Sequence, residues 1–233
     1  GVQINNFVKS VYLRIREIKF KENFQNSPDL YPGDYIIDIA KDILENHPKL
    51  NVDNYENCFD ELKNKSLKLS MDSIKKDLKR LGIEHNNFVS ETYLVNEDFV
   101  NKTVHLLKKG NHIEEGFLQP PKGTENKNWK KIRRLIFKST KFGDDNDRAL
   151  QKNDGSWTYF ANDVGYHNFK ISKKYDLLIN ILGADHTGYI KRIKAAVEAI
   201  SNGKIKLNCK VSQLVKLFKD GKPFKMSKRA GDF

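Results

Sequence analysis

A short segment near the end of the sequence carries the side chains best suited to phosphate chemistry. Lys225, Ser227, Lys228 and Arg229 place three cations and a hydroxyl within five residues, with Met226 among them. Such groups could hold a triphosphate and neutralise the charge that builds on departing pyrophosphate. An exposed basic loop would have the same composition, because short runs of Lys and Arg usually lie on the solvated surface.

A second candidate site consists of Tyr159 and Asp163, at positions i and i+4. We expect Tyr159 at the end of a strand and Asp163 in the first turn of the helix that follows. A carboxylate can accept two parallel hydrogen bonds from a guanidinium, and a phenol can add a third contact. The pair therefore indicates a site for a cation. The alternative is an ordinary first-turn acid, which the helix dipole stabilises without any ligand.

A third candidate lies in the segment 183–188, which follows an apolar run and leads into a predicted helix. Gly183 permits a tight turn and a close approach of the backbone to a ligand. Asp185 and His186 offer polar groups for a ribose or an amino group. An Asp at the start of a helix is also a common cap, so that reading stays open.

The remaining composition excludes several classes of protein. Cys58 and Cys209 share no metal-binding spacing, so we expect reduced thiols, no disulfide and no tightly bound metal. No apolar run approaches the roughly 20 residues that would span a bilayer. The start of the sequence shows no secretory signal. These features favour a cytoplasmic protein.

The charge of the chain favours a polyanionic partner. Lys and Arg outnumber Asp and Glu by 42 to 30, which gives a net charge of +12. Phosphates neutralised by such cations release condensed counterions, which favours binding. The lysines are scattered along the sequence, however, so a solvated lysine-rich surface is the competing interpretation.

The first half of the sequence has the apolar period of helices. The pattern predicts helices at about 3–25, 34–47, 53–81 and 97–110. We expect Ser27-Pro28 to end the first helix and Asn96 to cap the fourth. The buried face expected in the third helix consists of Leu67, Met71, Ile74 and Leu78.

The second half alternates between strand and helix patterns after a loop rich in Pro, Gly and Asn at 119–128. Strands are predicted at 135–139, 157–160, 177–182 and 206–211. Helices are predicted at about 162–171 and 186–200. This alternation favours an α/β domain with a mostly parallel sheet, in which ligands bind beyond the carboxyl ends of the strands.

The order of these motifs resembles one family. The segment Lys225–Gly231 resembles the KMSKS signature of class I aminoacyl-tRNA synthetases. The rest of the chain resembles the bacterial-type arginyl-tRNA synthetases in particular, and the resemblance covers nearly all of it. The collinear segments that carry it are Gly1–Asn6, Tyr31–Tyr35, Phe142–Asp145, Asp154–Tyr159, Gly183–His186 and Lys225–Gly231.

This resemblance implies roles for the candidate residues. The family's Tyr-x-x-x-Asp pair binds the guanidinium of arginine, and it matches Tyr159 and Asp163. The ATP-binding residues would be Gly183, Asp185, His186, Lys225, Met226 and Lys228. Lys225, Ser227 and Lys228 would be catalytic. Gln213 matches a recurrent family residue, although a strand-edge amide explains it equally well.

The resemblance also implies a reaction and a fold. Arginine would attack the α-phosphorus of ATP, which arrives with Mg²⁺, and the arginyl group would then pass to tRNA(Arg). The expected fold is a class I Rossmann-like nucleotide-binding fold, in a monomer. We expect residues 1–40 to be a helical part of this core, 41–130 a mostly helical connective insertion, and 131–233 the second half of the core.

One departure from the family pattern limits what the chain is expected to do. No His-x-Gly-His sequence occurs in it. We expect that HIGH element before Gly1 and the anticodon-binding domain after Phe233, so residues 1–233 alone should form no adenylate. Two alternatives stay open, another class I aminoacyl-tRNA synthetase and a non-catalytic RNA-binding module with a synthetase fold.

Overall fold

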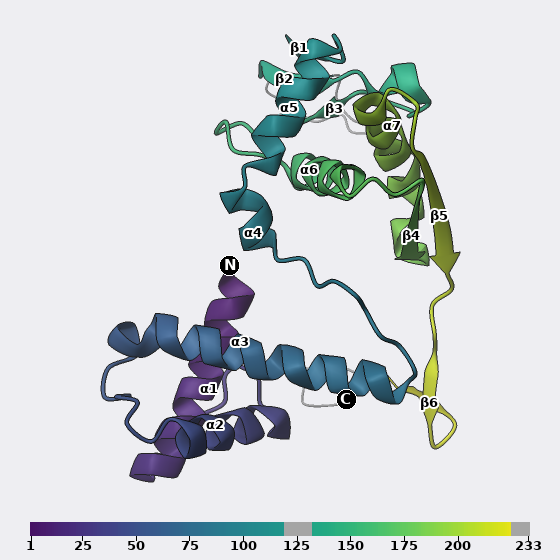
Figure 1. Cartoon of the computed structure of the whole chain (residues 1–233). Helices are drawn as coiled ribbons and strands as arrows, with labels where there is room; N and C mark the ends of the chain where they lie inside the picture. Colours follow the sequence, from purple (N-terminus) through teal and green to yellow (C-terminus); the bar gives the residue numbers. More distant parts are fainter. Residues whose placement is uncertain (119–131, 225–233) are drawn as a thin grey trace, which may run out of the picture. The chain divides into compact units, whose positions relative to one another are not determined.

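A computed structural model describes residues 1–118 and 132–224 of the chain (Figure 1). The chain divides into two compact units. One unit contains residues 1–86 and the chain after Val215, and the other is Asn87–Val215. The segments 1–40, 41–130 and 131–233 were expected from the resemblance to the family, whereas these two units are defined by contacts within the chain. The division into three segments stays a prediction.

The first unit is built on three helices. These are α1 (Val2–Phe20), α2 (Asp34–Asn46) and α3 (Tyr55–Arg80). They pack on one another through apolar faces, and Val8, Val11 and Ile15 of α1 are completely buried. Asn54 caps α3 by accepting a hydrogen bond from the backbone N–H of Asn57 at 3.0 Å. These packed faces confirm the helical character predicted for this part of the chain.

Helix α1 ends earlier than the sequence pattern predicts. Lys21 adopts a left-handed backbone conformation with φ 60°, and its N–H bonds to the carbonyl of Glu17. This local cap stops the helix at Phe20, several residues before the proline that was expected to end it. The end of α3 agrees with prediction, because Gly82 follows it with φ 74°.

The buried face of α3 also differs from the prediction. Its buried residues are Cys58, Leu62 and Ser66, all in the first half of the helix. In the predicted face, Ile74 is 38% exposed, and Leu67, Met71 and Leu78 are only partly buried. The predicted face is therefore only partly covered, and the fully buried positions lie nearer the start of the helix.

A short antiparallel hairpin forms the last part of the described chain. It consists of β6 (Leu217–Lys219) and β7 (Lys222–Phe224). Asp220 and Gly221 have φ 51° and 71°, the two positive values that a tight two-residue hairpin turn requires. The Asp-Gly dipeptide is a usual sequence for such a turn.

The second unit mixes helices and strands. Its helices are α4 (Glu91–Asn96), α5 (Phe99–Lys109), α6 (Tyr159–Ser172) and α7 (Ile190–Ser201), with the 3-10 turns η1 (Ser139–Phe142) and η2 (Ala184–Tyr189). Its strands are β1 (Ile113–Gly116), β2 (Arg134–Phe137), β3 (Arg148–Ala149), β4 (Leu177–Gly183) and β5 (Lys206–Ser212). Among all helices in the described residues, none is long and apolar enough to cross a bilayer.

Two kinds of sheet organise this unit. β4 and β5 are parallel, run in register from Leu177 with Lys206 to Gly183 with Ser212, and are connected through α7. β1, β2 and β3 form an antiparallel sheet. Within residues 1–118 and 132–224, β4 with β5 is therefore the only parallel pair, which corrects the expected mostly parallel sheet.

The core of the second unit lies between α5, α6, α7 and the strands. Val164 on α6, Ile193 on α7 and Phe137 on β2 have at most 1% of their surface exposed. Leu178 and Leu207 belong to the same cluster and bring the parallel pair into it. The two helices predicted at about 162–171 and 186–200 are thus confirmed as α6 and α7. Their packing in one core holds α6 against the strands that precede and follow it.

Two local predictions in this unit are wrong. Trp157 pairs with Gln151 only in an isolated bridge, and residue 159 already begins α6, so no strand spans 157–160. The apolar and aromatic residues there resemble a strand pattern, but the side chain of Thr158 starts a helix. Similarly, Asp98 rather than Asn96 precedes α5, because Asn96 ends the separate short helix α4.

Candidate functional site

The start of α6 determines where the carboxylate of Asp163 lies. Thr158 accepts a hydrogen bond from the backbone N–H of Ala161 at 3.2 Å, which caps the helix. The hydroxyl of Thr158 also lies 3.2 Å from the carbonyl of Leu150, to which it donates. These contacts tie the first turn of α6 to the preceding strand and fix which face of the helix carries Asp163.

The carboxylate of Asp163 has a partner on η2. The hydroxyl of Tyr189 donates a hydrogen bond to Oδ2 of Asp163. Burial, reinforced by this hydrogen bond, raises the pKa of Tyr189 far above its usual value. The phenol therefore stays protonated at neutral pH and continues to donate to Asp163.

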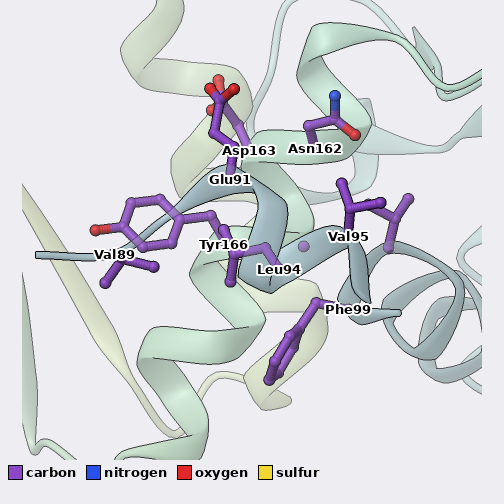
Figure 2. A pocket seen from close by; sticks show the side chains of 10 residues that line it. Val89, Glu91, Leu94, Val95, Phe99, Asn162, Asp163 and Tyr166 are labelled. Atoms are coloured by element: carbon purple, nitrogen blue, oxygen red, sulfur yellow. The ribbon is translucent and has the colours of Figure 1, made fainter. Parts of the chain in front are cut away.

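A pocket of about 340 Å³ opens beside Asp163, between α4, α5 and α6 (Figure 2). Its lining residues are Val89, Glu91, Leu94, Val95, Phe99, Val100, Asn162, Asp163, Gly165 and Tyr166. In the view of Figure 2, the carboxylates of Glu91 and Asp163 lie at the same end of the pocket, and the apolar side chains lie below them. Two acids above an apolar wall suit a cation carried on an aliphatic stem.

The structure does not bring Tyr159 into this pocket. Tyr159 is the first residue of α6, and its side chain is 85% exposed. Its ring lies 5.8 Å from Nζ of Lys152. Asp163 follows one turn later and is half-buried. The predicted pair therefore lies on one helix, but only its acid lines the pocket.

A polar chain fixes the buried side of α6. His167 lies with Nδ1 2.8 Å from the carbonyl of Asp163, and Nδ2 of Asn180 on β4 lies 2.9 Å from its Nε2. Because a carbonyl can only accept, Nδ1 carries the proton and Nε2 accepts from the Asn180 amide. Burial lowers the pKa of His167, which keeps the ring neutral. Nζ of Lys170 completes the chain by donating to Oδ1 of Asn180 at 3.0 Å.

The predicted ATP-contacting residues lie at the carboxyl end of the parallel pair. Gly183 is the last residue of β4, and Asp185 and His186 follow in η2. Their side chains are exposed, and Nε2 of His186 lies 3.5 Å from Oδ2 of Asp185. Gln213 follows the last residue of β5 and is exposed, so it lies beyond the strand rather than within it.

The segment Phe142–Asp145, which carried part of the family resemblance, forms a buried ion pair rather than an open site. Arg148 donates from its Nε and one terminal nitrogen to the carboxylate of Asp144 at 2.6 and 2.7 Å. Burial alone would raise the pKa of Asp144, but hydrogen bonds from Arg148, the Asp145 backbone and Ser139 outweigh it and hold this pKa below its usual value. Lys191 on α7 bonds to Asp145 at 2.7 Å.

The segment Lys225–Arg229 lies outside the described residues. The last described residue, Phe224, ends β7 and immediately precedes Lys225. The predicted phosphate-binding roles of Lys225, Met226, Ser227 and Lys228 therefore stay predictions. In the part of the chain that the structure describes, no group of three or more His, Cys, Asp or Glu side chains could hold a metal ion.

Known proteins resemble the chain over its entire length. No protein-family model matches it. The arginine–tRNA ligase of Pelagibacter ubique is 56% identical over 235 residues, covering 100% of this chain and 41% of that relative. The arginine–tRNA ligase of Roseobacter denitrificans is 45% identical over 100% of this chain and 40% of its own length. The chain belongs to the arginine–tRNA ligase family.

Solved arginyl-tRNA synthetases support this assignment and the α/β fold. A structure from Campylobacter jejuni aligns with a TM-score of 0.68 and 33% identity, covering 97% of this chain and 45% of that one. A structure from Plasmodium falciparum aligns with a TM-score of 0.51 at 16% identity over 88% of this chain, which is a likeness of fold alone. The chain spans about 40% of the length of the curated arginine–tRNA ligases it matches.

Glu91 and Tyr189 are two residues of this candidate arginine–tRNA ligase site that sequence reasoning missed. Glu91 starts α4, and Ser90 caps that helix by accepting from the N–H of Tyr93 at 3.5 Å. An acid in a first turn is usually explained by the helix dipole alone, so nothing local marks Glu91. Tyr189 follows the Gly183–His186 motif, but no sequence signal connects it to a carboxylate on another helix.

Proposed function

We propose that this chain is part of the catalytic core of an arginine–tRNA ligase and carries its arginine-binding pocket. In the reaction, the carboxylate of arginine attacks the α-phosphorus of ATP, giving arginyl-adenylate and pyrophosphate. The arginyl group then passes to a terminal ribose hydroxyl of tRNA(Arg), and AMP leaves. The observation that carries this proposal is the pocket in which Asp163 and Glu91 lie above apolar side chains.

The chemistry of that pocket fits arginine better than other amino acids. A guanidinium presents five N–H donors in a planar fork, which two carboxylates can accept from different sides. Leu94, Phe99 and Tyr166 supply surface for the aliphatic part of the side chain. A neutral or shorter side chain would leave at least one carboxylate without a donor, and that cost is the basis of selectivity.

We retain Tyr159 as a proposed contact with the guanidinium. Its side chain is 85% exposed, so it would have to leave that rotamer to reach a ligand at Asp163. Tyr159 lies one helical turn before Asp163, and residues at this spacing share a helix face. Closure of Tyr159 over bound arginine would then exclude water from the ion pair.

ATP is proposed to bind beyond the carboxyl ends of β4 and β5. Gly183 would allow the nucleotide to approach the backbone, and Asp185 and His186 would contact its ribose or the amino group of arginine. Lys225, Ser227 and Lys228, with Met226, would hold the phosphates together with the Mg²⁺ that accompanies ATP. Catalysis would consist of positioning and electrostatic stabilisation, because the amino acid itself is the nucleophile.

The chain by itself is proposed to be inactive in adenylate formation, because it contains no His-x-Gly-His element. Activity assays therefore use a full-length synthetase that contains residues 1–233, for example joined to the remaining parts of the Pelagibacter ubique relative. The same assay on residues 1–233 alone tests the claim of inactivity. Exchange of pyrophosphate into ATP by the isolated chain would refute it.

An amino-acid panel tests the proposed function. Exchange of labelled pyrophosphate into ATP is measured with arginine, lysine, citrulline and glutamine, in the presence of tRNA(Arg). We expect exchange with arginine alone. Exchange with a different amino acid would indicate another class I synthetase, and no exchange with any amino acid would indicate a non-catalytic RNA-binding module.

A further inference from the structure

Tyr189 connects two parts of the candidate site that are separate in the sequence. It is the last residue of η2, the turn that begins after Gly183 and carries Asp185 and His186. At the same time its hydroxyl donates to Oδ2 of Asp163 on α6. One short, hydrogen-bonded turn therefore joins the proposed ATP-contacting residues to the acid that lines the proposed arginine pocket.

The ring of Tyr189 is fixed by its neighbours. Phe160, in the first turn of α6, contacts it edge-on with 6.3 Å between ring centroids and an interplanar angle of 80°. The guanidinium carbon of Arg192, one turn further along α7, lies 5.2 Å from the centroid of the Tyr189 ring. These two contacts restrain the ring and therefore the direction of its hydrogen bond to Asp163.

We propose that Tyr189 is a positioning residue of the arginine site, which orients the Asp163 carboxylate for the guanidinium and couples that carboxylate to the nucleotide-contacting turn. This inference rests on the proposed function. Without the phenol, the Asp163 side chain would be free to rotate about its terminal bond. A rotating carboxylate loses part of the alignment that paired hydrogen bonds to a guanidinium require.

The hydrogen bond also limits what remains for the ligand. An ionised carboxylate accepts at about four lone-pair positions on two oxygens. Tyr189 occupies one position on Oδ2. Oδ1 and the remaining position on Oδ2 stay available for two parallel N–H donors. Lysine, whose ammonium is a compact point charge, gains less from such fixed geometry than arginine does.

The coupling to η2 has a second consequence. ATP bound at Asp185 and His186 would contact the same turn that ends in Tyr189. Because the phenol would transmit a shift of that turn to Asp163, each substrate would change the affinity for the other. Replacement of the phenol removes the connection between the two events but leaves each set of direct contacts in place.

The test is Tyr189→Phe in a full-length synthetase containing residues 1–233, with Tyr175→Phe as the matched control. Tyr175 is 52% exposed and does not line the pocket beside Asp163. We expect Tyr189→Phe to raise the KM for arginine about tenfold or more, because one hydrogen bond to a charged group is lost. The kcat should change little, and the lowering of the arginine KM by saturating ATP should disappear.

A double-mutant cycle separates positioning from a structural role. Asp163→Asn, Tyr189→Phe and the double variant are compared by the KM for arginine, and thermal unfolding is followed in each. Positioning predicts that Tyr189→Phe adds little once Asp163→Asn is present. Additive effects, an equal fall in kcat, or loss of folded protein with Tyr189→Phe would overturn the inference.

The inference and the proposed function fail in different ways. An unchanged arginine KM in Tyr189→Phe, together with a raised KM in Asp163→Asn, overturns the role of Tyr189 alone. An unchanged arginine KM in both variants overturns the arginine pocket itself, and the role of Tyr189 with it.

Discussion

Glu91 on α4 and Asp163 on α6 line the same pocket, although they come from different helices of the second unit. Each acid alone has an ordinary explanation as a helix residue. Their shared position above an apolar wall is the feature on which the proposed recognition of a long cationic side chain rests.

Replacement of Glu91 by Gln should weaken arginine binding. The change removes one of two charges facing the proposed guanidinium and keeps the size of the side chain. We expect the KM for arginine to rise by about ten- to a hundredfold, the range that corresponds to a lost charged hydrogen bond. Glu97→Gln is the matched control, because Glu97 follows α4 and does not line the pocket. An equal change of the arginine KM in the two variants would contradict a role of Glu91 in arginine binding.

The ion pair of Asp144 with Arg148 should be important for stability. Asp144 has a side chain only 1% exposed, whereas Arg148 is 22% exposed. Asp144→Ala leaves the Arg148 guanidinium and the backbone N–H of Asp145 without the acceptor they share. The free energy of unfolding should fall by on the order of 3 kcal/mol, as expected when one partner of a buried pair is removed.

The control for this measurement is Asp145→Ala. Its ion pair with Lys191 is exposed, with 63% and 61% of the side chains accessible. Exposed ion pairs contribute at most about 1 kcal/mol to the free energy of unfolding. Chemical denaturation of residues 1–233 measures both variants, and a loss in Asp144→Ala no larger than in Asp145→Ala would contradict the account.

Acid should weaken the same ion pair. The pKa of Asp144 in the folded chain is lower than in the unfolded chain. Its stabilising contribution is therefore complete above the unfolded pKa and is lost as the pH falls through the folded pKa. The difference in unfolding free energy between wild type and Asp144→Asn should thus shrink on acidification, and a constant difference would contradict this assignment.

Several features of the fold follow from the sequence because they depend on local pattern. The apolar periods predict α2, α3, β4 and β5 well, and the Asp220-Gly221 turn needs only the backbone preferences of its two residues. Local chemistry can also mislead. Thr158 converts an apparent strand into the start of α6, since a single side-chain cap outweighs the apolar pattern around it.

The candidate site is less predictable because its contacts connect distant parts of the chain. Asp163 was found from its spacing to Tyr159 and from the family resemblance. The contact from Tyr189 spans 26 residues and has no local signature. Glu91 joins the site only through the packing of α4 beside α6. Such contacts depend on tertiary structure, which no period in the sequence encodes.

The lysines of the Lys225–Arg229 segment should act on the chemical step rather than on arginine binding. Lys228→Ala removes a cation that is predicted to neutralise departing pyrophosphate. We expect kcat for pyrophosphate exchange to fall by about a hundredfold or more, with a smaller change in the KM for arginine. Lys204→Ala, an exposed cation between α7 and β5, is the control. A similar loss in both variants would indicate a general effect of charge.

The most direct test of the arginine pocket is the KM for arginine in Asp163→Asn, measured by pyrophosphate exchange in a full-length synthetase containing residues 1–233. The change keeps the shape of the side chain and an acceptor for Tyr189, but removes the charge. We predict a rise of about a hundredfold or more in the arginine KM, because the guanidinium loses one of its two charged acceptors, with the KM for ATP little changed. An unchanged arginine KM would contradict the proposal that Asp163 recognises the guanidinium.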